Sequence, residues 1–421
     1  MLATELYLDR FPLLFEEFCA VVGPESWLRP HRNLLSHTKR NQWLRAHHHE
    51  QNQVVFDLAE CSAIREKYGV LPTETLRGAR LHAGMTFAAQ TLSLHNSLEG
   101  KNRTAFLGRL RGAFKNSRDM SGLRLELSVA THFLRRGCSL IWPEFSDQNS
   151  GKPSFDLLVE DLGTDGLEIE CKSVSNDKGR RIDGETVAEL ALLVKQQMSF
   201  ANDLTQGLAV VVTVLDRLPR HATELKALLK AITRQVMTGE SGVLDDGTRV
   251  DLRDFDGSVA AQLDERDPAL RQVLEAVTQT TNVPTLVIGK RGRGALVVAF
   301  QSARRDTFLN EVFDTVADAA KRQLSGRRAG LVVVGLEAID AAALKSLAQH
   351  DHAASNDPSA LRLYVSRLLN RSDLSHLVGA SFGSKGNLID GNQVLTTDGS
   401  SYNFFKKESP LWHPAIESAF S

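Results

Sequence analysis

Apolar residues in the first part of the chain recur with the spacing of helices. They return every three or four positions in the opening segment, as at Leu6, Phe11, Leu14, Phe15 and Phe18. This period places apolar side chains along one face of a helix. Because strand-like runs of β-branched residues are few in this part, we expect residues 1–115 to form a helical N-terminal region.

The pattern changes to alternating helices and strands in residues 116–215. An amphipathic helix is predicted from Ser117 to Gly137, since glycine commonly ends a helix. Strands are then expected over residues 139–145, 155–160 and 166–174, a helix over residues 183–201, and a wholly apolar strand over residues 208–215. Wholly apolar strands are typical of sheets covered on both faces. The order predicts a mixed central sheet flanked by helices.

The remainder, residues 216–421, is expected to form an α/β C-terminal extension or a second domain. Helices are predicted over residues 224–237 and 308–324, and strands over residues 285–288, 295–300, 330–336 and 377–382. Asp390 and Gly391 between two apolar pairs predict a hairpin. The polar, acidic stretch 239–267 is expected to be a loop. The fold class that follows is α/β.

Composition and charge exclude a protein that is basic throughout. The chain has 421 residues, of which 42% are hydrophobic and 24% charged, and its net charge is −1. Nucleic-acid binding would therefore depend on local basic patches. The four cysteines are scattered without a C-x-x-C pair, which fits a reducing compartment. Since no apolar run approaches the roughly 20 residues of a membrane helix, we expect a cytoplasmic protein without membrane partners.

Candidate chemistry lies in one of three E-x-K tripeptides. They are Glu99 to Lys101, Glu224 to Lys226, and Glu170 to Lys172. Only the third falls in a predicted strand, where Glu168, Glu170 and Lys172 alternate with apolar residues and share one face. Three charges on the face of an otherwise apolar strand require partners or a metal, because buried charges are costly.

Asp156 lies fourteen residues before Glu170, in another predicted strand. A short turn joins the two strands, so a hairpin can bring the two carboxylates together. Paired carboxylates can hold a hard cation such as Mg²⁺, and Lys172 beside them can orient water or neutralise charge on a phosphate. The alternative is a structural ion-pair cluster at a sheet edge.

With these residues the chain resembles the PD-(D/E)xK nuclease superfamily, which includes restriction, repair and phage-defence nucleases. Here Pro153 is separated from Asp156 by two residues, and the family often loses or displaces that proline. The resemblance covers about residues 117–215 and implies a restriction-endonuclease-like sheet. It also implies Asp156 and Glu170 as ligands of Mg²⁺ or Mn²⁺, and Lys172 as the catalytic lysine.

Further site residues follow from the same resemblance. Many members carry a glutamate on the helix before the first core strand, which here is Glu126, as a further catalytic residue and metal ligand. Some add a glutamine near or after the E-x-K strand, which Gln196 or Gln197 could match. The alternative for Glu126 is a solvent-facing helix residue. Glu168 is expected to be an ion-pair partner.

Local basic groups could bind the phosphates of a nucleic acid. They are Arg109, Arg111 and Lys115 before the Glu126 helix, Lys178, Arg180 and Arg181 after the E-x-K strand, and Lys290, Arg291 and Arg293 among glycines. Solvated surface is the alternative for each group.

The sequence thus predicts a metal-dependent nuclease that hydrolyses phosphodiester bonds, with DNA as the expected partner. The alternatives are an RNA-cleaving enzyme and a nuclease-like fold that binds nucleic acid or assembles without catalysis. A restriction or phage-defence setting is an analogy with the family. The family also includes homodimers, which cut two strands with two sites. By the same resemblance this chain could form a homodimer or bind a partner in a defence complex.

Overall fold

The chain forms two compact units, each built from separate stretches of sequence. Unit 1 comprises Met1–Asn33, Gln51–Lys178 and Leu309–Ser421, and unit 2 comprises Leu34–Glu50 and Gly179–Phe308. The computed structural model describes residues 5–79, 81–145, 155–257, 268–289, 294–353, 357–386, 388–391, 393–397 and 399–420. The α/β class is confirmed, with mixed sheets flanked by helices. Within these described ranges, no helix has the length and apolar character needed to cross a membrane.

The N-terminal region is helical, as predicted. Its helices are α1 (Phe11–Val22), α2 (Glu25–His37), α3 (Gln42–Gln51), α4 (Gln53–Tyr68), α5 (Thr73–Ala79), α6 (His82–Ser97) and α7 (Gly100–Ala113). Aromatic side chains fill the space between α1, α2 and α6, where the rings of Phe18 and Trp27 stack 5.3 Å apart. Leu6 departs from the prediction because it lies in β1 (Leu6–Tyr7), which pairs with β13 (Val394–Thr397).

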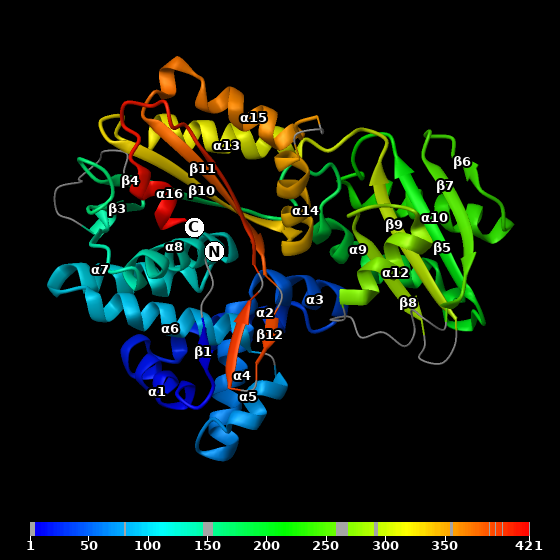
Figure 1. Ribbon diagram of the computed structural model, residues 1–421. Helices are drawn as coiled ribbons and strands as arrows, with labels where there is room; N and C mark the ends of the chain where they lie inside the picture. Colours follow the sequence, from blue (N-terminus) through cyan, green and yellow to red (C-terminus); the bar gives the residue numbers. More distant parts are fainter. Residues whose placement is uncertain are drawn as a thin grey trace. The chain divides into compact units, whose positions relative to one another are not determined.

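The main sheet of unit 1 has six strands. In spatial order they are β14 (Ser401–Phe405), β11 (Leu377–Lys385), β10 (Ala329–Asp340), β4 (Leu167–Val174), β3 (Leu157–Val159) and β2 (Leu140–Ile141). The strands β2, β3 and β4 are antiparallel, whereas β4, β10 and β11 are parallel. Figure 1 shows α8 (Ser117–Arg135) along one face and α13 (Phe308–Arg322) and α15 (Ala360–Leu369) along the other.

Shorter elements complete unit 1. They are η1 (Pro143–Phe145), α14 (Ala341–His352), η3 (Ser372–Leu374), β12 (Leu388–Asp390) and α16 (Pro414–Ala419). The strand expected over residues 139–145 is limited to β2, because the chain turns into η1 at Pro143. The predicted hairpin at Asp390 and Gly391 is confirmed by the antiparallel pairing of β12 with β13.

Unit 2 has its own five-stranded sheet. In spatial order its strands are β6 (Gly242–Val243), β7 (Arg249–Phe255), β5 (Gly207–Val214), β9 (Ala295–Ser302) and β8 (Thr285–Gly289). Its helices are α9 (Gly184–Gln197), η2 (Ser199–Asp203), α10 (Ala222–Thr238) and α12 (Pro268–Thr278). Val194 of α9 and Leu229 of α10 pack with Val210 and Val298 in its core. This sheet therefore has a hydrophobic core independent of the six-stranded sheet.

The two sheets divide the chain differently from the predicted boundaries after residues 115 and 215. We expected residues 208–215 to join the sheet of the E-x-K strand, but β5 pairs with β7 and β9 instead. The parallel neighbour of β4 is β10, with Val332 opposite Glu170. Both β5 and β10 are strongly apolar, so hydrophobicity alone could not show which of them pairs with β4.

The prediction of a loop over residues 239–267 was wrong where β6 and β7 form. In β7, Val250 and Leu252 alternate with Arg249, Asp251 and Arg253, which is the period of a half-buried strand. The acidic surroundings concealed this short alternation. Residues 258–267 lie outside the described part of the chain.

Candidate metal and nuclease site

The predicted hairpin between the Asp156 and Glu170 segments is confirmed. Leu157 pairs with Ile169 in the antiparallel register of β3 and β4, and the Asp156 backbone N–H donates to the carbonyl of Ile169 at 3.1 Å. The Asp156 carboxylate then accepts the Cys171 N–H through Oδ2 at 2.7 Å. The Asp156 side chain therefore accepts a hydrogen bond that a backbone carbonyl would accept in a regular ladder between β3 and β4. This places Asp156 at the end of β3, beside Glu170.

Glu170 and Lys172 form an ion pair within β4. Lys172 Nζ lies 2.5 Å from Glu170 Oε1. The Glu170 side chain is fully buried, whereas the Lys172 side chain is 26% exposed and reaches solvent. The second oxygen, Glu170 Oε2, is buried and has no hydrogen-bond partner among the described residues. One half of this carboxylate is thus paired, and the other half can accept a cation or a hydrogen-bond donor.

Glu126 shows the same division between its two oxygens. It lies in α8, where its side chain is only 5% exposed, so the alternative of a solvent-facing residue was wrong. Arg109 Nη2 of α7 lies 2.5 Å from Glu126 Oε1, and the same guanidinium pairs through Nη1 with Glu144 of η1. Glu126 Oε2 is buried and without a hydrogen-bond partner in the described part of the chain.

The three carboxylates influence one another electrostatically. Burial, followed by the charge of Asp156, raises the pKa of both Glu126 and Glu170. Burial also raises the pKa of Asp156, against the lowering effects of the Cys171 backbone hydrogen bond and of Lys172 and Arg109. Asp156 is therefore the central acid, coupled to a glutamate in α8 and to another in β4. A bound cation would relieve this repulsion.

The two glutamates come from elements on different sides of the sheet. Gly335 pairs with Ser173, and a Cβ at Gly335 would lie 3.3 Å from Leu125 of α8. Gly335 and Ser173 therefore point to the same face of the sheet, which is the face that α8 covers. Ser173 is three positions from Glu170 in the same strand, so Glu170 points to the opposite face. Consistent with this separation, no group of three or more His, Cys, Asp or Glu side chains in the described residues is arranged to hold a metal ion. Asp156 and Glu170 are the candidate pair for a cation, because their side chains interact directly.

Glu168 is an ion-pair partner, as predicted. Its carboxylate accepts hydrogen bonds from the backbone N–H of Ser325 at 2.7 Å and from the Ser325 hydroxyl at 2.5 Å. Arg328 Nη1 lies 3.5 Å from Glu168 Oε1. Both carboxylate oxygens thus have donors, which distinguishes Glu168 from Glu126 and Glu170. Cys171, between Glu170 and Lys172 in β4, is buried.

The first predicted basic group lies on α7 and just beyond it. Arg109 is held between Glu126 and Glu144, and Arg111 Nε donates to the carbonyl of Val22 at 3.3 Å. Lys115 is exposed. The link between Arg109 and the acidic site, and the contact of Arg109 with Glu144, were not predicted from the sequence. The sequence signal for this contact was a basic residue on α7, the helix that precedes α8.

The second basic group is divided between the units. Lys178 belongs to unit 1 and lies 3.9 Å from Glu311. Arg180 and Arg181 belong to unit 2, where Arg180 donates to the carbonyl of Asn282 and Arg181 lies 3.7 Å from Asp216. The third group, Lys290, Arg291 and Arg293, lies outside the described residues, as does Pro153.

The two candidate glutamines belong to unit 2. Gln196 and Gln197 are exposed at the end of α9. The helix that leads from β4 into the next strand of its own sheet is α13, not α9, because β10 follows α13. The structure therefore brings Asp156, Glu170, Lys172 and Glu126 into one unit, and it places the glutamines in the other.

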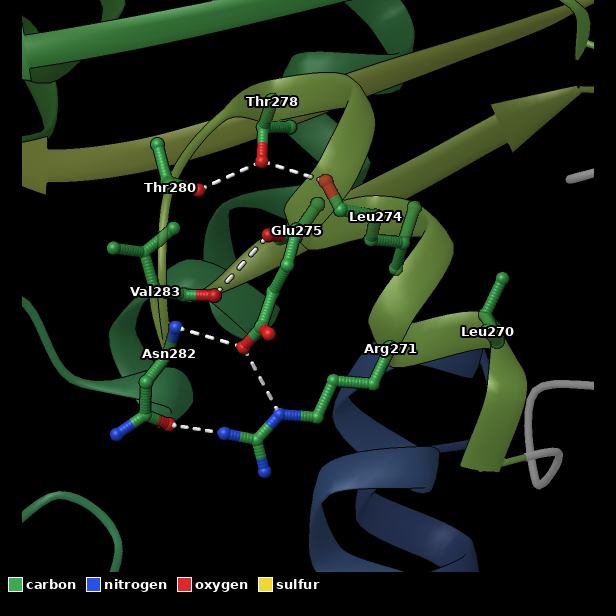
Figure 2. Close-up of a pocket in the computed structure, with 9 residues that line it drawn as sticks. Leu270, Arg271, Leu274, Glu275, Thr278, Thr280, Asn282 and Val283 are labelled. Carbon is green, nitrogen blue, oxygen red and sulfur yellow. Dashed lines mark hydrogen bonds and ion pairs between the residues drawn. The ribbon is translucent and has the colours of Figure 1, made fainter.

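A separate pocket of about 260 Å³ lies in unit 2 between α12 and the start of β8. Figure 2 shows its polar groups bonded to one another. Arg271 Nε lies 3.2 Å from Glu275 Oε1, and Arg271 Nη2 donates to Asn282 Oδ1 at 3.0 Å. The Thr278 and Thr280 hydroxyls lie 2.7 Å apart. Because these groups already satisfy one another, the acidic site of unit 1 is the stronger candidate for chemistry.

Comparisons with protein-family models, curated proteins and solved structures found no match to this chain.

Proposed function

We propose that unit 1 carries a metal-dependent nuclease site that hydrolyses phosphodiester bonds, with DNA as the substrate. The observation that carries the proposal is the buried carboxylate oxygen of Glu170 without a hydrogen-bond partner among the described residues, next to Asp156. Burial and the charge of Asp156 raise the pKa of Glu170 to about 8, because an ionised oxygen without a donor is costly in a buried site. A bound cation would remove this cost, so the residues fit the metal that the family resemblance implies.

Strand order supports a restriction-endonuclease-like sheet within this proposal. The helix and strand predicted at residues 183–201 and 208–215 belong to unit 2, but α13 and β10 would take their places in unit 1, giving the order α8, β2, β3, β4, α13 and β10. Most of unit 2 is the stretch Gly179–Phe308, which follows β4 in the sequence and ends at the first residue of α13. In this proposal, unit 2 is largely an insertion into the nuclease core.

Asp156 and Glu170 would hold Mg²⁺ or Mn²⁺, whereas Glu126, on α8, would act on this pair through the charge that it shares with Asp156. The metal would supply Lewis acidity toward the phosphate and a lower pKa for a bound water. The Cys171 N–H fixes the orientation of the Asp156 carboxylate. Lys172 reaches solvent from a fixed strand position, so its ammonium can bind a phosphate oxygen and neutralise the charge that develops there.

A second candidate function is nucleic-acid binding or assembly without catalysis. It is favoured by the internal pairing of Glu126 with Arg109 and of Glu170 with Lys172, which a purely structural cluster would also show. Crystals soaked in Mn²⁺ distinguish the two functions. An anomalous peak between Asp156 and Glu170 supports the nuclease, and an undisturbed cluster supports the structural role.

A cleavage assay with supercoiled, linear and single-stranded DNA and with RNA tests the activity. We expect Mg²⁺- or Mn²⁺-dependent cutting of DNA that is lost in Asp156→Ala, Glu170→Ala and Lys172→Ala. The matched control is Lys226→Ala, because Glu224 and Lys226 form an exposed E-x-K on α10. Full activity in Glu170→Ala and Lys172→Ala would reject the assignment, and cutting of RNA alone would change the substrate class.

A further inference from the structure

The outward face of α7 carries basic and small residues. Phe106, Leu110 and Ala113 are the buried residues of this helix, and the residues opposite to them recur every three or four positions, as along one face of a helix. Figure 1 shows α7 at the periphery of unit 1, beside α8. We define the basic face of α7 by six exposed residues in the helix and the turn after it, Lys101, Ala105, Gly108, Arg111, Gly112 and Lys115.

The sequence around this face has an excess of basic residues. Residues 100–118 include six basic residues and no acidic residue, and Glu99 and Asp119 flank them. The elements packed against α7 add Glu126 of α8 and Glu144 of η1, and both of these carboxylates contact Arg109. Even when all four acids are counted, the basic residues outnumber them. The basic face of α7 is therefore positively charged.

Two basic side chains of this face have donors left for a ligand. Arg111 donates through Nε to the carbonyl of Val22 at 3.3 Å, which fixes the guanidinium and leaves its two Nη groups. Lys115 is exposed, and its side chain makes no hydrogen bond or ion pair with the described residues. Arg109 differs from both, because Glu126 and Glu144 already hold its guanidinium.

Gly108 and Gly112 lie between these basic residues. A Cβ at either glycine would meet no atom of the described residues within 4 Å, so nothing packed on the helix there requires a glycine. Glycine within a helix also lowers stability relative to alanine. Such glycines alone identify no site, since Gly78 of α5 is equally open. Between basic side chains, however, they allow a charged partner to approach the helix closely.

We propose that the basic face of α7 contacts the phosphate backbone of the DNA duplex that the site in unit 1 would cut. This inference rests on the proposed function and names a surface that would hold the substrate. A DNA duplex carries one negative charge per about 1.7 Å of its axis. A face without acids that spans roughly 20 Å of helix matches this continuous charge. Arg111 and Lys115 bind phosphates, and the backbone lies against Gly108 and Gly112.

Fluorescence anisotropy of a labelled DNA duplex, measured in EDTA over a range of NaCl concentrations, tests this surface without cleavage. The double variant Arg111→Gln, Lys115→Gln should bind about tenfold or more weakly near 0.1 M NaCl. The slope of log affinity against log salt should fall by about 0.9 for each lost phosphate contact. Lys115→Gln alone should lower the slope by about 0.9, and this variant keeps the bond between Arg111 and Val22.

The matched control is the double variant Lys226→Gln, Lys230→Gln. It removes the same charge from exposed positions of α10 in unit 2, and its affinity and salt slope should equal those of the wild type. An equal loss of affinity in the two double variants would overturn the proposal, because only the net charge would then matter. An unchanged slope in Lys115→Gln would also overturn it.

Gly108→Gln tests the close approach to the helix without a change of charge. It should raise the urea midpoint of unfolding, since glutamine is the better helix former, and it should nevertheless lose affinity for the duplex. Gly78→Gln, at the open glycine of α5, is the control and should keep the wild-type affinity. Unchanged DNA binding in Gly108→Gln, or an equal loss in Gly78→Gln, would overturn the contact at α7.

Failure of this inference can be separated from failure of the proposed function. Duplex binding that depends on Arg111 and Lys115, in a protein that does not cut DNA with Mg²⁺ or Mn²⁺, keeps this surface and rejects the nuclease. Metal-dependent cutting with binding unaffected by the double variant keeps the nuclease and rejects this surface. If the wild type binds anionic phospholipid vesicles through Lys115 and does not bind the duplex, the basic face serves a membrane and the proposal is overturned.

Discussion

Asp156 accepts the backbone N–H of Cys171 through Oδ2 at 2.7 Å, so a side-chain carboxylate continues the hydrogen-bond ladder between β3 and β4. The bond connects the first acid of the site to the strand that carries Glu170 and Lys172. Asp156 therefore has two separable roles. Its oxygen completes the sheet, and its charge acts on Glu126 and Glu170.

Two substitutions at Asp156 separate these roles. Asp156→Asn keeps an oxygen acceptor for Cys171 and removes the charge, whereas Asp156→Ala removes both. We expect Asp156→Ala to unfold with a free energy about 1–3 kcal/mol lower than that of Asp156→Asn, because a backbone donor loses its partner. Urea unfolding followed by circular dichroism measures the difference.

Asp156→Asn and Asp156→Ala should not differ in metal binding, because neither variant carries the carboxylate. Both should lose Mn²⁺ binding and DNA cutting. The matched control is Asp161→Asn in the turn after β3, an exposed carboxylate that accepts the backbone N–H of Ser139 and whose amide would keep an oxygen acceptor for it. Equal stability of Asp156→Asn and Asp156→Ala would show that the Cys171 bond contributes little.

Local periodicity explains how much of this site could be predicted. The alternation of Glu168, Glu170 and Lys172 with apolar residues identified β4, and the short turn identified its pairing with β3. Both are short-range features, and the structure confirms them. The alternation also placed Glu168 correctly as an ion-pair partner, although its partners Ser325 and Arg328 lie more than 150 residues away.

Long-range pairing explains what could not be predicted. The choice of β10 rather than β5 as the neighbour of β4 depends on contacts across more than 150 residues of sequence, and both strands have suitable apolar patterns. Arg109 resembled a phosphate-binding residue because its helix is basic. Its pairing with Glu126 and Glu144 depends on how α7 packs against α8 and η1, which residue spacing does not determine.

Asn41 should stabilise unit 2, because its buried side-chain amide makes two hydrogen bonds there. Its Nδ2 donates to the carbonyl of Ala188 in α9 at 2.8 Å, and its Oδ1 accepts the Leu44 N–H at 3.1 Å, capping α3. Asn41→Ala should lower the stability of unit 2 by about 1–3 kcal/mol, since it removes a cap and leaves buried groups unpaired.

Hydrogen exchange measured by mass spectrometry can locate this effect. Exchange should accelerate roughly tenfold or more in β5, β7 and β9 of unit 2, and remain unchanged in β4 and β10 of unit 1. Gln42→Ala, at the exposed neighbouring position, is the control and should leave both sheets protected. Equal acceleration in the two sheets would show that the units do not unfold separately.

Asp351 should make unit 1 sensitive to acid. Its carboxylate, at the end of α14, accepts the Ser359 N–H at 2.7 Å, the Ser359 hydroxyl at 2.6 Å and the Tyr402 hydroxyl at 3.0 Å. Burial alone would raise the pKa of Asp351, but the bonds from Ser359 and Tyr402 and the charge of Arg362 together lower it. Asp351 therefore connects α14, the start of α15 and β14 through its ionised form.

The sign of the pH dependence follows from this lowered pKa. The unfolded chain takes up the Asp351 proton near its ordinary pKa of about 3.9, and the folded chain does so only at lower pH. The stabilisation is thus complete above about pH 4 and is lost as the pH falls through the folded pKa. Asp351→Asn should cost about 1–3 kcal/mol at pH 7, and its difference from the wild type should shrink below pH 4. Urea unfolding at pH 7, 5 and 3 measures both, and a difference that stays constant with pH would mean that the ionised form is not what stabilises these contacts.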